Sequence, residues 1–249
     1  MPFTVAICGK GGTGKTTLSV LLLRALLASG RKPVLAVDAD SASSLSRALG
    51  YEIERSIGDI REDSLKAASR MAGVSKQQYI DLEVNECIDE HEGFDILTMG
   101  RGEGPGCYCY VNNLLRGFMS RLKRNYRVIL IDSAAGMEHI SRQTVAAPDA
   151  LVLVANPTAA SLRAAAKIRG LGESLDSPAG KALLVINRAR PGSGQGGLQE
   201  LVSAVGAERV FHLPYVERIG EEAEVTDAVP DLPEPPAEIL EIVSAFGIE

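Results

Sequence analysis

The chain has 249 residues, of which 45% are hydrophobic and 23% are charged, so it can bury a sizeable core and is not a disordered, collagen-like or coiled-coil protein. Acidic residues outnumber basic residues by 32 to 26, and the net charge of −6 argues against sequence-independent binding to nucleic acid. Four cysteines are too few for a secreted disulfide scaffold, and the apolar run Leu18–Ala28 is interrupted by Arg24 and too short to cross a bilayer. We therefore expect a cytoplasmic protein that binds neither nucleic acid nor membrane.

Short apolar runs alternate with helical patterns along the whole chain. The predicted strands are Phe3–Cys8, Pro33–Val37, Phe94–Met99, Arg127–Ile131, Ala150–Ala155, Ala182–Ile186 and Arg209–Leu213. The predicted helical segments are Thr16–Ala28, Leu45–Leu49, Ile60–Arg70, Lys76–Glu90, Asn112–Arg124 (capped by Asn112 or Asn113), Ser161–Leu175, Leu198–Val205 and Pro236–Phe246, with proline in the first turn of the last. Several strands are apolar throughout, which is typical of strands buried on both faces. The pattern predicts an α/β fold, a mostly parallel twisted sheet flanked by helices, in one domain over residues 1–249.

A phosphate-binding loop follows the first predicted strand. The segment reads Gly9-Lys10-Gly11-Gly12-Thr13-Gly14-Lys15-Thr16-Thr17, and it contains G-x-x-x-x-G-K-T between a strand and a helix, as that motif requires. Glycines let backbone N–H groups turn toward phosphate oxygens, and the N-terminus of the helix favours their charge. We expect this loop to bind a nucleotide, with Lys15 at the β- and γ-phosphates and the Thr16 hydroxyl on Mg²⁺.

The second lysine of the loop, Lys10, makes it resemble the deviant P-loop of the superfamily of MinD, ParA, the arsenical pump and the nitrogenase iron protein. The resemblance implies a P-loop ATPase that hydrolyses ATP to ADP and phosphate with Mg²⁺. It also implies that Lys10 reaches across a homodimer interface to the partner's nucleotide, much as an arginine finger does.

Two acidic motifs agree with that resemblance. In Asp38-Ala39-Asp40, the resemblance implies that Asp40 orients the attacking water and that Asp38 lies near Mg²⁺. From the residues alone, both acids could instead cap the next helical turn. The segment Asp132-Ser133-Ala134-Ala135-Gly136 resembles Walker B and switch II, which implies that Asp132 holds Mg²⁺ through water and that the Gly136 amide senses the γ-phosphate.

Two later positions resemble the nucleotide-base contacts of the same superfamily. Asn187 follows the strand Ala182–Ile186, where relatives carry an asparagine that contacts adenine. Pro214-Tyr215 follows the next strand and resembles the loop that closes over the base. Each motif is weak alone, but their order and spacing favour an adenine site.

A pair of cysteines, Cys107 and Cys109, precedes the helix predicted from Asn112. Residues two apart in an extended chain point to the same side, and a nearby helix N-terminus favours the metal-binding thiolate. A C-x-C disulfide is strained, and a closed thiolate site usually needs four ligands, so a twofold dimer would complete the set. The alternative is two buried or incidental thiols, the role that we expect for Cys8 and Cys87.

At this point the resemblance narrows to the CooC-type carbon monoxide dehydrogenase accessory ATPases. It rests on Gly104-Pro105-Gly106-Cys107-Tyr108-Cys109 and on Gly136-Met137-Glu138-His139, together with the deviant P-loop. It implies a nucleotide-dependent homodimer that holds Ni²⁺, or Zn²⁺, between the paired Cys107 and Cys109. The client would be a nickel enzyme, carbon monoxide dehydrogenase.

Two other functions remain open at this stage. One is an electron donor like the nitrogenase iron protein, but a second cysteine after Walker B is missing at Ser133, Ala134 and Ala135. The other is a positioning ATPase like MinD or ParA, but the C-terminal segment Glu238–Phe246 is acidic, whereas membrane attachment favours a basic helix.

Overall fold

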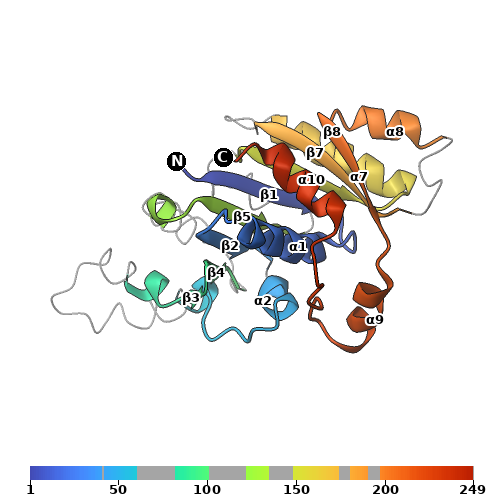
Figure 1. Ribbon diagram of the computed structural model, residues 1–249. Helices are drawn as coiled ribbons and strands as arrows, with labels where there is room; N and C mark the ends of the chain where they lie inside the picture. Colours follow the sequence, from blue (N-terminus) through green and yellow to red (C-terminus); the bar gives the residue numbers. More distant parts are fainter. Residues whose placement is uncertain are drawn as a thin grey trace.

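The computed structural model describes residues 1–40, 42–60, 82–100, 122–134, 148–173, 180–189 and 197–248. Its centre is an eight-stranded sheet with the order β3-β4-β2-β5-β1-β6-β7-β8 (Figure 1). The strands are β1 (Phe3–Gly9), β2 (Val34–Asp38), β3 (Ile88–His91), β4 (Phe94–Thr98), β5 (Val128–Asp132), β6 (Ala150–Ala155), β7 (Lys181–Ala189) and β8 (Arg209–Pro214). Every neighbouring pair is parallel except β3 and β4, which are antiparallel at one edge. The predicted mostly parallel α/β sheet is confirmed.

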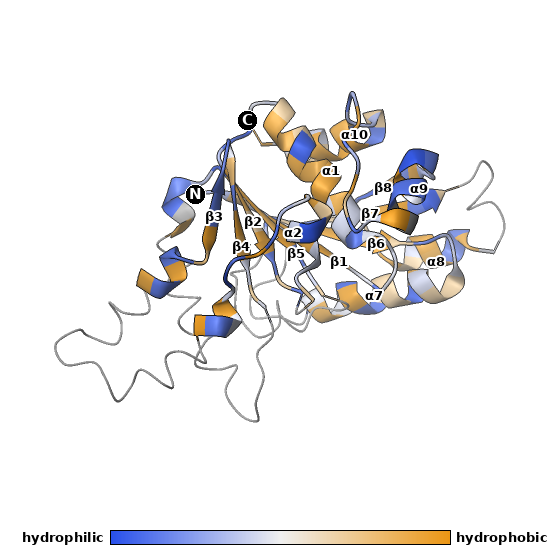
Figure 2. Ribbon diagram, turned by 90° about the horizontal axis from the view of Figure 1, so that it is seen from below, coloured by the Kyte–Doolittle hydropathy of each residue, from blue (hydrophilic) through white to orange (hydrophobic). Residues whose placement is uncertain are grey.

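Helices cover both faces of the sheet. On one face lie α1 (Lys15–Ala28), α2 (Ser44–Ala48) and α10 (Ala237–Phe246), and on the other lie α7 (Ala159–Glu173) and α8 (Gln199–Ala204) (Figures 1 and 2). A further helix, α9 (Glu217–Val225), follows β8, and a short 3₁₀ turn, η1 (Lys123–Asn125), precedes β5. Side chains of β1 alternate between the two faces, with Val5 and Ile7 under α1 and Ala6 and Cys8 toward α7. Burial on both faces explains why the strand sequences are apolar throughout.

The helix that follows the phosphate-binding loop, α1, is almost entirely inside the protein. It packs on the central strands and is covered by α10 and α2. Leu18, Leu22 and Leu26 are at most 1% exposed, and Figure 2 shows the hydrophobic colour along much of its length. A helix that is apolar around most of its circumference is expected to be buried in this way.

The last helix, α10, packs its apolar side onto the core through Ile239, Ile242, Val243 and Phe246. Lys181 Nζ donates hydrogen bonds to two of its C-terminal carbonyl oxygens, at 3.1 and 3.3 Å, and so satisfies groups that have no partner within the helix. Pro236 lies just before the helix rather than in its first turn. In the part of the chain that the structure describes, every helix is too short or too polar to span a membrane.

All seven predicted strands are present, and their ends differ from the prediction by at most three residues. The helix predicted over Lys76–Glu90 is wrong at its end, since helical residues 82–85 are followed by β3 from Ile88. The turn at Gly93, with φ +84°, folds β3 back on β4 and pairs Ile88 with Leu97, so that Ile88 packs against the apolar cluster that contains Leu97.

Helix α9 was not predicted, because it is short and mostly polar. Residues 61–81 and most of the helix predicted over Asn112–Arg124 lie outside the described residues, as do its proposed caps Asn112 and Asn113.

Candidate functional site

The phosphate-binding loop joins β1 to α1 at the carboxyl edge of the sheet. Gly12 and Gly14 have φ of +76° and +87°, which a side chain would make strained. A Cβ at Gly14 would also clash with the side-chain amide of Asn187, and a Cβ at Gly9 would clash with the carbonyl oxygen of Val154. The glycines therefore serve both the turn and the close approach of β6 and β7.

The two lysines of the loop lie in different environments. The Lys10 carbonyl oxygen accepts hydrogen bonds from the Thr13 hydroxyl at 2.9 Å, the Thr13 N–H at 3.4 Å and Lys15 Nζ at 3.5 Å. Lys15 is thereby held under the loop and is 9% exposed, whereas the side chain of Lys10 is exposed to solvent. Lys15 can act on a group inside the loop, and Lys10 can reach a group outside it.

Two carboxylates end neighbouring strands beside the loop. Asp38 and Asp132 are paired in the register of β2 and β5, and they are 0% and 1% exposed. The Ser19 hydroxyl lies 3.0 Å from Asp132 Oδ1, while Asp132 Oδ2 is buried with no hydrogen-bond partner among the described residues. Burial raises the pKa of Asp132 to about 6, and the hydroxyls of Thr16 and Ser19 and the charge of Lys15 oppose the rise.

Asp38 caps the next helical turn, one of the two roles considered from the sequence. Its Oδ2 accepts the N–H of Leu45 at 2.7 Å, and its Oδ1 accepts the N–H of Asp40 at 3.1 Å. Burial raises the pKa of Asp38 to about 7, and the negative charge of Asp132 adds to the rise. Asp40 is only partly covered, and its Oδ1 accepts the N–H of Ala42 at 3.0 Å. Asp38 is thus held by backbone hydrogen bonds, and Asp40 is the more accessible of these two carboxylates.

The oxygen atoms at this edge fit a magnesium ion. Mg²⁺ prefers carboxylate and hydroxyl oxygens and keeps several waters, and it is usually held by one or two carboxylates together with phosphates. Thr16, at the start of α1, and the unpartnered Asp132 Oδ2 supply oxygens of this kind. Over the described ranges, no group of three or more His, Cys, Asp or Glu side chains could hold a metal by itself, so nucleotide and water oxygens would complete the shell.

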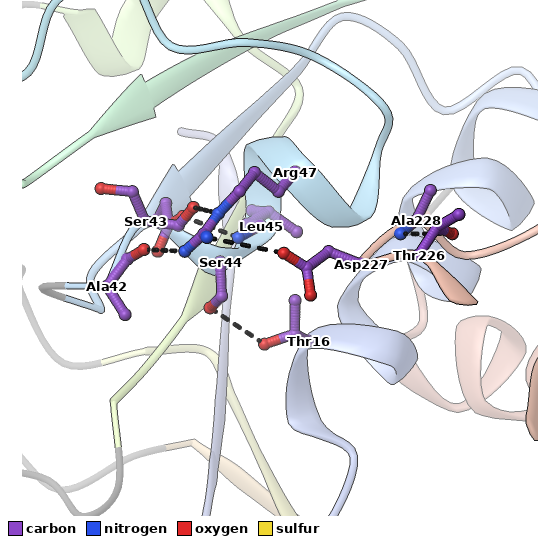
Figure 3. A network of polar contacts seen from close by, with 10 residues as sticks. Thr16, Ala42, Ser43, Ser44, Leu45, Arg47, Thr226, Asp227 and Ala228 are labelled. Atoms are coloured by element: carbon purple, nitrogen blue, oxygen red, sulfur yellow. Dashed lines mark hydrogen bonds and ion pairs between the residues drawn. The ribbon is translucent and has the colours of Figure 1, made fainter. Parts of the chain in front are cut away.

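A polar network connects this edge to the segment after α9 (Figure 3). Thr16 Oγ1 lies 3.4 Å from Ser44 Oγ, at the start of α2. On the next turn, the Arg47 guanidinium donates to the carbonyl oxygens of Ala42 and Ser43 and pairs with Asp227 at 3.5 Å.

A backbone hydrogen bond of 2.8 Å from Val229 N–H to Ala48 O reinforces the same junction. The loop that carries Asp40 is therefore tied to the chain that leads from α9 to α10.

On the other side of the loop lies an apolar pocket with about 670 Å³ of empty space, part of it open to solvent. Small-molecule sites are mostly apolar with a few polar groups, and the lining of this pocket has that character. The pocket is lined by Gly14, Thr17, Leu18, Leu21, Asn187, Arg188, Leu213, Pro214, Tyr215, Val216, Ile219, Gly220, Pro236 and Ile239. The structure thus brings together Thr17, Asn187 and Pro214, which the sequence proposed as nucleotide contacts.

Asn187 ties the apolar pocket to the phosphate-binding loop. Its Nδ2 donates to the carbonyl oxygen of Thr13 at 2.8 Å, and its Oδ1 accepts the N–H of Arg188 at 2.9 Å. Arg188 has φ +56°, and it lies at an irregularity in the β7–β8 pairing between Ile186 and Ala189, beside the pocket. Tyr215 is 53% exposed and lies against Gly220, where a Cβ would clash with its ring.

Several site residues were missed in the sequence. Ser19 lies one helical turn after Lys15, and that spacing was the available signal. Asn156 directly follows β6, at the edge where parallel sheets bind ligands, and its Nδ2 lies 3.5 Å from the carbonyl oxygen of Gly12. The apolar members of the pocket carried no motif. Cys107, Cys109 and Gly136 lie outside the described residues.

Comparison with known proteins gives consistent matches. The model of the CobQ/CobB/MinD/ParA nucleotide binding domain matches residues 4–229. An uncharacterized ATP-binding protein of Methanocaldococcus jannaschii is 36% identical over 224 residues, which are 87% of this chain and 86% of that protein. The carbon monoxide dehydrogenase accessory protein CooC of Rhodospirillum rubrum is 35% identical over 190 residues, 69% of each chain. The structure of the MinD cell division protein of Aquifex aeolicus has a similar fold, with a TM-score of 0.69 at 22% identity over 98% of this chain and 97% of that one.

Proposed function

Since this chain belongs to the CobQ/CobB/MinD/ParA nucleotide-binding family and is an ATPase, we propose that it couples ATP hydrolysis to the maturation of a nickel enzyme. The observation that carries the nucleotide part of the proposal is the phosphate-binding loop between a buried, unpartnered carboxylate oxygen of Asp132 and an apolar pocket. The similarity to CooC supports carbon monoxide dehydrogenase as the client.

In this proposal, the phosphates of ATP lie on the backbone N–H groups of residues 11–17, with Lys15 at the β- and γ-phosphates. The base enters the apolar pocket and contacts Asn187 and Pro214. The polar and apolar parts of the nucleotide thus match the two sides of the loop.

Thr16 and Asp132 would hold Mg²⁺, Asp132 through a water molecule. Asp38, next to Asp132 in the sheet, would lie near the ion without binding it directly. When bound, Mg²⁺ neutralises charge on the phosphate oxygens. Asp132 supplies a fixed oxygen because β5 and Ser19 hold its other oxygen in place.

Hydrolysis needs positioning more than covalent chemistry. Asp40 orients a water whose oxygen forms a bond to the γ-phosphorus, while the bond to the β–γ bridging oxygen breaks and ADP leaves. Lys15 stabilises the charge that develops on the departing phosphates. In a homodimer, Lys10 of one protomer adds a positive charge at the partner's nucleotide, and the Gly136 amide responds to the γ-phosphate.

The proposed cargo is Ni²⁺, with Zn²⁺ an alternative occupant, bound by Cys107 and Cys109 of both protomers. Four thiolates arranged around the twofold axis of a dimer form a complete site for a soft or borderline metal ion. Nucleotide binding favours the closed dimer, and the dimer favours metal, so each ligand strengthens binding of the other. Hydrolysis loosens the dimer and releases the metal to the client.

Attachment to a membrane through α10 is less well supported than the maturation role. The apolar residues Ile239, Ile242, Val243 and Phe246 of α10 face the core, so they are not available to a lipid surface. This observation, together with the acidic character of the segment, separates the chain from the positioning ATPases that attach through a basic helix.

The deciding experiment measures metal content and oligomer mass of the reduced, anaerobic protein with Ni²⁺, with and without a nonhydrolysable ATP analogue. We expect one Ni²⁺ per dimer, bound more tightly with the analogue and lost in Cys107→Ser and Cys109→Ser. Cys87→Ser is the matched control, because Cys87 is buried and 1% exposed.

Three outcomes contradict the proposal. Iron and sulfide in place of nickel would point to an electron donor. Nickel binding that ignores both cysteine substitutions would exclude the C-x-C site. Nickel binding and dimerisation that do not respond to nucleotide would exclude the coupling.

A further inference from the structure

We propose that Ser19 is a positioning residue for magnesium: its hydroxyl fixes Asp132 so that the unpartnered Oδ2 oxygen is the one presented to the ion. The inference rests on the proposed function, since it takes Asp132 as the magnesium carboxylate. Ser19 lies outside the G-x-x-x-x-G-K-T motif, and its contacts indicate this role.

Ser19 is 0% exposed and has two acceptors within reach. Its Oγ lies 3.0 Å from Asp132 Oδ1 and 3.0 Å from the carbonyl oxygen of Lys15. In an α-helix, the Lys15 carbonyl already accepts the backbone N–H of Ser19. The single proton of the hydroxyl is therefore best used by the carboxylate, since hydrogen bonds to a charged acceptor are the stronger ones.

The two oxygens of Asp132 differ as a result. Oδ1 is occupied by Ser19, whereas Oδ2 is buried without a hydrogen-bond partner among the described residues. A buried polar atom without a partner is unusual in a folded protein and indicates a ligand or water. Ser19 thus selects which oxygen is left over for the ligand.

The geometry of α1 explains why Ser19 and Thr16 can serve one ion. Positions three apart in a helix lie on the same face, so Thr16 and Ser19 share one face of α1; the Ser19 hydroxyl contacts Asp132 at the end of β5, and the Thr16 hydroxyl lies 3.4 Å from Ser44 Oγ. One hydroxyl is placed to bind the ion directly, and the other to orient the carboxylate behind its water. Groups that orient a metal-site carboxylate typically change metal affinity by about 10- to 100-fold when they are removed.

The test is the magnesium dependence of ADP binding, measured by calorimetry over a range of Mg²⁺ concentrations and in EDTA. We expect Ser19→Ala to raise the Mg²⁺ concentration for half-maximal enhancement at least about tenfold. ADP affinity in EDTA should stay at the wild-type value, because the hydroxyl does not touch the nucleotide. Ser19→Thr retains the hydroxyl and should restore the wild-type magnesium dependence.

Ser29→Ala is the matched control, since the hydroxyl of Ser29, at the C-cap of α1, likewise donates to the carbonyl four residues earlier (Ala25, 2.7 Å), but at the end of the helix far from the site. It should leave both affinities unchanged. Should Ser19→Ala fold poorly in thermal unfolding, Ser19→Cys keeps the volume with a much weaker donor, and the same loss of magnesium response is expected.

A reference variant, Asp132→Asn, separates the possible failures. If Ser19→Ala leaves the magnesium response intact while Asp132→Asn removes it, the role of Ser19 is wrong and the magnesium assignment stands. If neither variant changes the response, the assignment of Asp132 in the proposed function is itself wrong. If Ser19→Ala weakens ADP equally with and without Mg²⁺, Ser19 supports the loop and not the metal site.

Discussion

The two sides of the phosphate-binding loop are built on opposite physical principles. On the carboxylate side, formed by Asp38, Asp40 and Asp132, charged groups are crowded at the ends of β2 and β5, and two of them are buried. On the other side, the apolar pocket is lined mostly by hydrophobic side chains from α1, β8, α9 and α10.

The two sides differ in the sign of their contribution to the free energy of folding. Burying a carboxylate destabilises the fold until a cation or proton arrives, whereas burying apolar surface stabilises it at about 25 cal/mol per Å². The carboxylate side is therefore the part of the molecule whose stability should depend on magnesium and pH, and the apolar pocket the part that should not.

The largest expected effect is on hydrolysis. Lys15→Gln removes the positive charge that the loop holds under its own backbone, and phosphate release from ATP should fall by about 100- to 1,000-fold. Lys167→Gln, on the exposed side of α7, is the matched control and should hydrolyse ATP at the wild-type rate. Equal rates for the two variants would remove Lys15 from the chemistry.

The second prediction concerns pH in the absence of metal. The pKa of Asp38 is raised from its ordinary 3.8 to about 7, so the folded state keeps a proton that the unfolded state has released. The stabilisation is present at low pH and is lost as pH rises toward 7. Between pH 5 and 8 in EDTA, urea unfolding should show wild type losing about 2 to 3 kcal/mol relative to Asp38→Asn.

Magnesium and nucleotide should shrink this loss, because they supply the missing positive charge beside the carboxylates. Asp231→Asn, whose side chain is 91% exposed, should show no such trend against wild type. A difference between wild type and Asp38→Asn that stays constant with pH would contradict the burial argument.

The third prediction tests the apolar pocket. Tyr215→Ala removes an aromatic side chain from the pocket wall at little cost in stability, because that residue is 53% exposed. ADP should bind about 3- to 10-fold more weakly, by the same factor in Mg²⁺ and in EDTA. Tyr51→Ala, which removes another partly exposed tyrosine far from the pocket, should leave ADP affinity unchanged. A magnesium-dependent loss would break the separation between the two sides.

The smallest effect is expected where the two sides are joined. The pair between Arg47 and Asp227 is solvent-exposed and 3.5 Å long, so it should contribute less than about 1 kcal/mol. Arg47→Asp combined with Asp227→Arg should recover part of the loss of ADP affinity that each single change causes. If the loss of ADP affinity in the double variant equals the sum of the losses in the two single variants, the ion pair does not couple the two sides.

The sequence predicted the carboxylate side better than the apolar pocket for a physical reason. Phosphate and metal chemistry demands particular residue types at fixed spacing, as in Gly14-Lys15-Thr16, whereas Leu21 and Ile239 could be any apolar residues of similar size. Most strands could be predicted because burial on both faces makes them uniformly apolar. The hairpin of β3 and β4 could not be predicted, since β3 is short and polar and depends on the turn at Gly93.

Ser19 shows the limit of local patterns most directly. Its partner Asp132 is 113 residues away, and only the adjacency of α1 and β5 brings the two together. Asp38 shows another limit, because a helix cap and a metal-site acid require the same residue type at the same place. The hydrogen bonds that Asp38 accepts from the N–H groups of Leu45 and Asp40 show that it caps the helix, and they are compatible with a magnesium ion nearby.

The burial of α1 links nucleotide binding to amide hydrogen exchange along the whole helix. Because this helix is enclosed by the sheet, α2 and α10, its interior amides can exchange with deuterated solvent only when much of the fold opens. A nucleotide held at its first turn lowers the population of those open states in proportion to its occupancy. Amide exchange along α1, as far as its last turn at Ala28, therefore reports on the nucleotide at the opposite end of the helix.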